Sequence, residues 1–196
     1  MNSRLPAIAL VAMLAACAAV KDAAIPAKPA LARVALKNAD FAMEPVPGRA
    51  CPPLWGCTMH ADPTSFRFSL EADPRSGVKF LQVERVKNEP WAIASQIVLA
   101  DGLQGKRLRL AAAVQSEGID GKGAGPLLII QGPGGRTLAE AQRLVQRSTG
   151  WQEVAVELDV VPGAQLVEVG LYLEGGGIVH FGEVRLEILG PATARQ

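Results

Sequence analysis

Few side chains in this chain of 196 residues are of the types that carry out covalent or metal chemistry. There are three cysteines, at 17, 51 and 57, and two histidines, at 60 and 180, which are far apart in the sequence. The Gly-x-Ser-x-Gly, His-Glu-x-x-His, Walker A and Gly-x-Gly-x-x-Gly patterns do not occur. Carboxylates are numerous, but no pair stands out as the acid and base of glycoside cleavage. The sequence therefore favours a non-catalytic protein, and a hydrolase with a site outside these patterns is the open alternative.

The first cysteine, Cys17, lies near the end of an apolar run that spans residues 5 to 20. Arg4 is the only charged residue before this run. The run is shorter than the ~20 residues that a helix needs to cross a bilayer. A short basic start, an apolar middle and small residues at the end are typical of a secretory signal peptide. The alanines around Ala15 would also allow an ordinary cleavage site, so a chance cysteine in an Ala-rich signal is the alternative to a functional Cys17.

The tetrapeptide Leu14-Ala15-Ala16-Cys17 resembles the lipobox of bacterial lipoproteins. The resemblance implies that residues 1–16 are a signal peptide, that it is cut before Cys17, and that Cys17 carries lipid. Each buried CH₂ contributes about 0.8 kcal/mol, so two or three acyl chains anchor a protein firmly to a membrane. Ala18 follows the cysteine, where lipoproteins retained on the inner membrane commonly carry Asp. The resemblance thus favours the outer membrane of the bacterial cell envelope.

The remaining chain is electrically balanced and has the length of one domain. Residues 1–16 contain one base and no acid, which leaves 19 Lys and Arg against 19 Asp and Glu. No long basic run appears, which argues against nucleic acid as a partner. Residues 17–35 are rich in Ala and Pro and are expected to be the lipidated cysteine and a tether. Residues 36–190 are expected to form the domain, and residues 191–196 a disordered tail.

Apolar and polar residues alternate with a period of two along most of this domain, which indicates half-buried strands. The clearest runs are residues 66–70, 107–114, 153–160, 166–173 and 183–188, with further strands expected at 78–86, 93–99 and 126–132. Gly- and Pro-rich turn signals separate them. The segment at 137–146 alone looks helical, as a short helix or an irregular crossing. Strands at this spacing predict an antiparallel β-sandwich or barrel.

Cys51 and Cys57 are the two cysteines that remain after Cys17. In an exported protein they lie in a compartment where disulfides persist, and their spacing is too wide for a Cys-x-x-C redox pair. The sequence predicts that they form a structural disulfide, worth roughly 2 kcal/mol for so small a ring. Trp55 lies between them, either as a lid on the core or as a displayed contact, and the lid is favoured.

The chain from about residue 38 to residue 188 resembles a galactose-binding-like jelly roll of the carbohydrate-binding-module type. The motifs are "NADFAMEP", "SGVKFLQV", "ASQIVLADGLQGKRLRLAAAVQ" and the closing order from "STGWQ" through "VPGA" and "EGGG" to "HFGEVRLEIL". The resemblance implies an all-β jelly-roll sandwich in which Trp151 is a core residue, with a ligand platform as the alternative role of Trp151. It also implies a binding module for a glycan, such as an envelope polysaccharide. An envelope assembly protein that binds another protein through a sandwich face is the alternative.

Members of this family often hold a structural calcium through an N-terminal Glu and an Asp near the last strand. Glu44 lies near the first position, but the chain has Glu183 where the Asp pair is expected. Calcium takes 6 to 8 oxygen ligands, so a missing carboxylate lowers the affinity. No cofactor is therefore expected, and calcium at Glu44 and Glu183 is left open.

The candidate ligand-binding residues follow from strand parity. Tyr172 alternates with Leu171 and Leu173, so it should point outward. Arg107, Arg109 and Arg185 also point outward from their strands, and Trp91 lies in a turn from which it can reach over an edge. An aromatic face beside planar charged groups is suited to a sugar ring. The predicted site is thus Trp91, Arg107, Arg109, Tyr172 and Arg185, and the alternative is an ordinary solvated sheet face.

Overall fold

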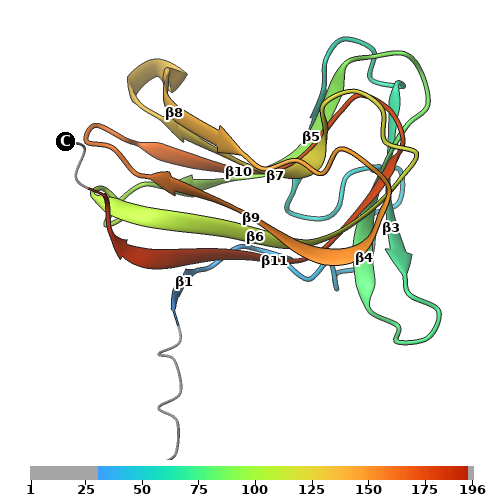
Figure 1. Ribbon diagram of the computed structural model, residues 1–196, viewed down its shortest axis with the longest axis horizontal. Coiled ribbons are helices and arrows are strands. Elements are labelled where there is room, and N and C mark those ends of the chain that lie inside the picture. Colours follow the sequence, from blue (N-terminus) through green and yellow to red (C-terminus); the bar gives the residue numbers. More distant parts are fainter. Residues whose placement is uncertain (1–30, 194–196) are drawn as a thin grey trace, which may run out of the picture. The chain divides into compact units, whose positions relative to one another are not determined.

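Eleven strands form two antiparallel sheets in the part of the chain that the computed structural model describes, residues 31 to 193 (Figure 1). The first sheet, named here the β11 sheet, contains in spatial order β3 (Phe66–Ala72), β4 (Lys79–Arg85), β11 (Ile178–Pro191), β6 (Lys106–Glu117) and β9 (Thr149–Asp159), with β1 (Ala32–Val34) also paired to β11. The second, the β10 sheet, contains β2 (Gly56–Met59), β5 (Trp91–Leu99), β10 (Leu166–Glu174), β7 (Gly123–Gln131) and β8 (Thr137–Gln142).

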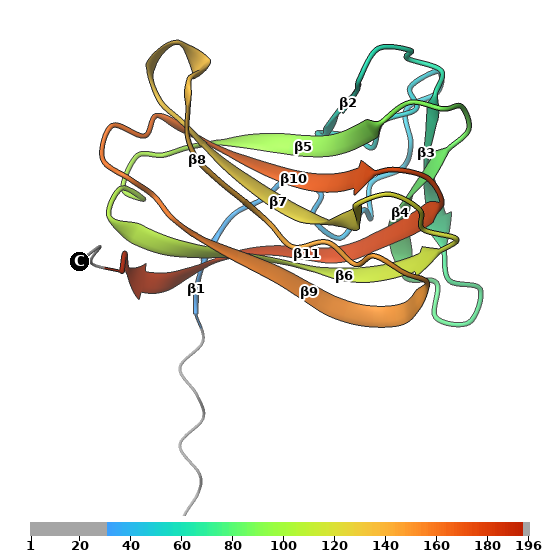
Figure 2. The same cartoon turned by 45° about the horizontal axis from the view of Figure 1, so that its top comes forward.

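The two sheets pack face to face, as the two layers of Figure 2 show. Apart from the hairpins β3–β4 and β7–β8, neighbouring strands within each sheet are not consecutive in the sequence, so the chain crosses repeatedly between the layers, as in a jelly roll. The inward-facing positions of β10 and β6 are fully buried apolar side chains: Val167, Val169, Leu171, Leu173, Leu108, Leu110, Ala112 and Val114. The expected antiparallel β-sandwich is confirmed.

The alternating runs lie within strands, to within one residue at their ends, but three strands without a clear period were not predicted. They are β1, β2 and β8. Residues 137–142 form β8, not a helix, because they pair with β7 along one edge of the β10 sheet. Leu, Ala, Glu and Gln favour helices, but tertiary pairing overrides this weak propensity. Within residues 31–193 the only helical element is a 3₁₀ turn at Pro133–Gly135.

The folded part extends slightly beyond the expected domain. Ala32–Val34, expected in the tether, pairs with β11, and β11 itself runs to Pro191. A three-residue strand is too short to show a period in sequence. The lipobox and Cys17 lie outside the described residues. Among residues 31–193, no helix is long and apolar enough to cross a membrane.

The predicted disulfide joins the loop before β2 to β2 itself, because Cys57 is the second residue of this strand. Cys51 and Cys57 form a disulfide, with sulfurs 2.11 Å apart and Cα atoms 5.6 Å apart. Trp55 is 6% exposed, its ring centroid lies 5.5 Å from that of Phe41, and its Nε1 donates to the Asn38 carbonyl at 3.1 Å. The disulfide and the lid role of Trp55 are thus confirmed in this structure.

The prediction that Trp151 belongs to the core is wrong, because its side chain is 45% exposed. Trp151 lies on the outer face of the β11 sheet, where its ring contacts those of Phe80 and His180 at centroid distances of 5.6 and 6.1 Å. The physical reason is strand parity. Trp151 is two residues before Glu153, which also points outward, so both leave the core on the same side of β9.

Candidate functional site

A groove of about 620 Å³ lies over the outer face of the β10 sheet. All five strands of this sheet contribute lining residues, and Lys122, just before β7, also lines the groove. The lining residues are Thr58, Trp91, Ile93, Lys122, Leu127, Ile129, Glu140, Gln142, Glu168, Tyr172 and Glu174. Because outward residues of a strand are two apart, residues on adjacent strands form rows across the groove.

The floor of the groove is apolar and is shaped by a glycine. Gly170 lies opposite Ser95 on β5 and Leu127 on β7. A Cβ atom at Gly170 would lie 2.6 Å from Cδ1 of Ile93 and 3.5 Å from Cβ of Leu127. Ile93 and Leu127 therefore extend over the glycine, and both are less than 9% exposed. A larger residue at position 170 would displace them and raise the floor.

Two aromatic rings stand beside this floor. Tyr172 is the register partner of Ile93, and Trp91 is the partner of Glu174, so the two rings project from neighbouring strands. Their centroids are 6.3 Å apart with planes at 38°. The ring of His60 follows, 6.1 Å from that of Trp91. The predicted association of Trp91 with Tyr172 on one surface is therefore present.

Polar groups surround the rings. The Tyr172 hydroxyl donates to Glu174 Oε2 at 3.1 Å, and Lys122 Nζ lies 2.8 Å from Glu174 Oε1. Gln131 Nε2 donates to Glu168 Oε2 at 3.0 Å. Burial, followed by the negative charge of Glu174, raises the pKa of Tyr172 well above its ordinary value, so this residue stays a neutral hydroxyl. Flat rings, an apolar floor and a polar rim together suit a ligand with both C–H and hydroxyl surface.

The three predicted arginines do not share this surface. Arg107 and Arg109 lie on β6, and Arg185 lies on β11, so all three belong to the other sheet. Grouping them with Tyr172 was wrong for a simple reason. Strand parity shows that a side chain leaves the core, but it does not show from which of two sheets it leaves.

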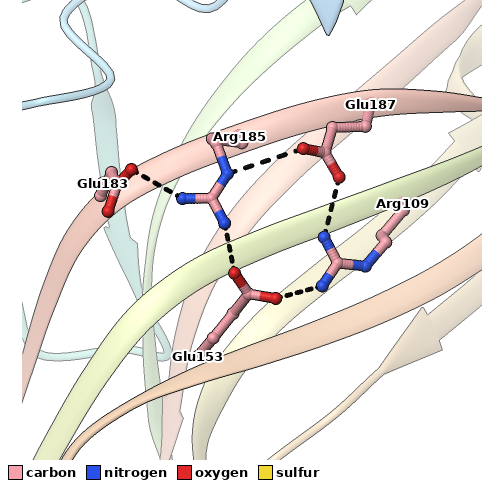
Figure 3. A network of polar contacts seen from close by, with 5 residues as sticks. All are labelled: Arg109, Glu153, Glu183, Arg185 and Glu187. Atoms are coloured by element: carbon pink, nitrogen blue, oxygen red, sulfur yellow. Dashed lines mark hydrogen bonds and ion pairs between the residues drawn. The ribbon is translucent and has the colours of Figure 1, made fainter. Parts of the chain in front are cut away.

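The arginines are engaged in ion pairs that join three strands (Figure 3). Arg109 Nη1 lies 2.8 Å from Glu187, and Arg109 also contacts Glu153 on β9. Arg185 contacts the same Glu153, and lies 2.9 Å from Glu183 and 3.6 Å from Glu187. Figure 3 shows that Arg109, Glu153, Arg185 and Glu187 form a closed ring of alternating charge.

The third arginine is paired in a similar way. Arg107 binds Glu157 at 2.9 Å and Asp159 at 3.0 Å, and both carboxylates belong to β9. The donors of the three guanidinium groups thus point mainly at carboxylates of the same sheet. This arrangement ties β9, β6 and β11 together.

The carboxylates considered for calcium are engaged with cationic side chains. Lys79 Nζ lies 2.5 Å from Glu44 Oε1 and also donates to the Ala42 carbonyl at 3.3 Å. Glu183 pairs with Arg185. Among the residues that the structure describes, no group of three or more His, Cys, Asp or Glu side chains is arranged to hold a metal ion. The residues present do not fit a calcium site, because an ammonium group already neutralises Glu44 and a guanidinium group neutralises Glu183.

Another hollow, of about 680 Å³, lies between residues 143–147 and β9. Its described lining contains no aromatic side chain and consists largely of polar groups, among them Arg143, Arg147, Thr149 and Gln152. It lacks the combination of ring faces and apolar floor that marks the groove on the β10 sheet.

Several groove residues were not singled out from the sequence. Glu140 and Gln142 were missed because residues 137–142 looked helical, so no outward face could be assigned to them. Glu168 and Glu174 share the strand and the parity of Tyr172, so the same outward pattern could have assigned them to its surface. Thr58 and Lys122 gave no signal, because β2 has no visible period and Lys122 precedes β7.

No family model and no curated protein matches the chain in sequence. Solved structures do match in fold. The CBM22-1 xylan-binding domain from Paenibacillus barcinonensis Xyn10C superposes with a TM-score of 0.52 at 12% identity, covering 74% of this chain and 91% of that one. A CBM4 structure superposes with a TM-score of 0.52 at 14% identity, covering 79% and 99%.

The enzymatically active domain of bacteriophage CBA120 tailspike protein 4 superposes with a TM-score of 0.55 at 12% identity. It covers 79% of this chain, but this chain spans only 21% of the tailspike chain. At such low identities these likenesses establish the fold alone. The protein has the jelly-roll fold of carbohydrate-binding modules.

Proposed function

We propose that this protein is a non-catalytic glycan-binding module, and that sugar rings bind in the groove over the β10 sheet. The observation that carries the proposal is the pair of rings, Trp91 and Tyr172, 6.3 Å apart beside an apolar floor. The C–H face of a sugar packs on an aromatic ring, while its hydroxyls need hydrogen-bond acceptors and donors close by. Glu174, Lys122 and Gln142 line the same groove and supply such groups.

The shared fold supports this proposal. The superposition with this chain covers most of the length of the xylan-binding domain and of the CBM4 structure. The likeness therefore extends over the whole sandwich and is not limited to a fragment. The experiment is a glycan array probed with the full chain in a detergent without a sugar headgroup. We expect specific binding to at least one glycan class, with competition by the soluble form of that glycan. A blank array would contradict the proposal.

A second candidate function is supported by the opposite face. Trp151 is 45% exposed on the β11 sheet and packs with Phe80 and His180. Exposed aromatic residues are typical of protein contact surfaces. An envelope assembly lipoprotein would use such a face to bind another protein. A pull-down from envelope extract tests this alternative, because Trp151→Ala should then abolish capture of the partner while glycan binding is unchanged.

We also propose that the module is held at the bacterial cell envelope by lipid on Cys17, with the outer membrane favoured. The motif Leu14-Ala15-Ala16-Cys17 supports this, and strand β1 begins at Ala32. The segment between the two would then be the tether.

A further inference from the structure

The groove is strongly acidic although the whole chain carries a formal net charge of only +1. Three carboxylates line it, those of Glu140, Glu168 and Glu174, against one ammonium group, that of Lys122. This concentration of negative charge coincides with the two aromatic rings. The charge of the lining is therefore a property of the site and not of the protein as a whole.

The three carboxylates differ in how they are compensated. Glu174 is paired with Lys122 at 2.8 Å and also accepts the Tyr172 hydroxyl. Glu168 accepts a hydrogen bond from Gln131, which is neutral. Within residues 31–193, neither Glu168 nor Glu140 forms an ion pair. Two negative charges in the groove are thus left without a cation.

These two charges face each other across an apolar residue. Ile129 on β7 is the register partner of Glu168 on β10 and of Glu140 on β8. Two strand spacings separate the backbones of the two glutamates, roughly 10 Å. Tyr172 stands on the same face of β10, four residues beyond Glu168, and the charge of Glu140 contributes to raising the pKa of its hydroxyl. The negative potential therefore extends over the ring platform.

We propose that the groove selects glycans with free amino groups, such as chains that contain de-N-acetylated hexosamine units, over neutral and uronic-acid glycans. This inference rests on the proposed glycan-binding function. An ammonium group on the sugar would pair with Glu168 or Glu140, and the faces of Trp91 and Tyr172 attract a cation as well. A uronic-acid carboxylate would instead be repelled, since it would meet like charge in a partly desolvated groove.

The test compares glycans that differ only in the amino group. β-1,4-linked glucosamine oligomers, the matched N-acetylglucosamine oligomers and oligogalacturonate are titrated into the full chain by calorimetry. We expect the glucosamine oligomers to bind at least about tenfold more tightly than the acetylated ones, and the galacturonate not to bind. The preference should shrink as the salt concentration rises toward about 1 M, because exposed charges are then screened.

Variants separate charge selection from binding itself. Glu140→Gln together with Glu168→Gln should lower the affinity for the glucosamine oligomers to about that for the acetylated oligomers, and so remove the preference for the amine. Glu71→Gln, an exposed carboxylate on β3 of the other sheet, is the matched control and should change nothing. Equal affinity of the wild type for both oligomers, or a preference that persists in the double variant, would overturn this inference while the glycan-binding function stands. Failure of every glycan to bind would overturn both.

Discussion

The rings of Trp91 and Tyr172 lie 6.3 Å apart at 38° on the outer face of the β10 sheet. They come from neighbouring strands: Glu174 is the cross-strand partner of Trp91, Ile93 is the partner of Tyr172, and the two aromatic residues are therefore two residues apart in register. Gly170 lies on the same strand two residues before Tyr172, and the side chains of Ile93 and Leu127 pack over it. A rigid sheet thus holds an aromatic platform in place before any ligand arrives, and this limits the entropic cost of binding.

The ion-pair ring on the β11 sheet should stabilise the fold and not contribute to binding. Glu187 is only 7% exposed, and Arg109 is its nearest cation. Arg109→Met leaves that carboxylate with the longer Arg185 contact, so we expect the free energy of unfolding to fall by about 2 kcal/mol. Denaturant unfolding measures this. Unchanged stability, or a loss of glycan affinity in the folded variant, would contradict the assignment.

Asp62, in the turn before β3, should make the stability of the fold depend on pH in the acid range. Hydrogen bonds from the Thr64 hydroxyl and backbone, and from Lys87, lower the pKa of Asp62 from 3.8 to about 2. A depressed carboxyl pKa contributes stability that is present above the unfolded value and is lost as the pH falls through the folded value. The difference in melting temperature between wild type and Asp62→Asn should therefore be largest above pH ~4 and shrink toward pH ~2. A difference that is independent of pH would refute this role of Asp62.

The disulfide should be quantitatively formed in the native protein. Intact-mass analysis after denaturing alkylation without reductant should find no free thiol on Cys51 or Cys57. The double variant Cys51→Ser, Cys57→Ser should lose roughly 2 kcal/mol, because the open loop regains chain entropy. Two alkylated cysteines in the native protein would contradict the bond.

Lipid anchoring predicts a change of cellular fraction. Cys17→Ala removes the acceptor for the acyl chains, so the protein should stall in processing or be released into the soluble fraction. Fractionation followed by immunoblotting measures this, with Cys51→Ser, Cys57→Ser as a control that keeps Cys17. Unchanged membrane association of a fully processed Cys17→Ala protein would refute the anchor.

Much of this fold follows from local pattern. The alternation in residues 166–173 places Leu171 and Leu173 in the core and Tyr172 outside, as the structure shows. The edge strand β8 could not be predicted, because its own residues favour a helix and it becomes a strand only through pairing with β7. Trp151 was assigned to the core from the family resemblance. Its strand parity, which it shares with Glu153, indicates the surface instead.

The groove was only half predictable. Tyr172 was identified by its outward strand parity and Trp91 by its place in a turn-like segment. The pairing of β5 with β10 brings the two side chains together on one surface. The three arginines have equally strong outward patterns but lie on the other sheet. Which strands share a sheet depends on contacts between distant segments, so the sequence pattern of one strand cannot assign its outer face to a site.

The central claim is that Trp91 and Tyr172 form the sugar platform. The most direct measurement is the affinity of Tyr172→Ala and Trp91→Ala for the glycan that the array identifies, with Trp151→Ala as a control of equal size on the opposite face. We predict that each groove variant binds at least tenfold more weakly, about 1.4 kcal/mol, with little change in melting temperature, and that the control binds as the wild type. Wild-type affinity in both groove variants, while they remain folded, would contradict the account.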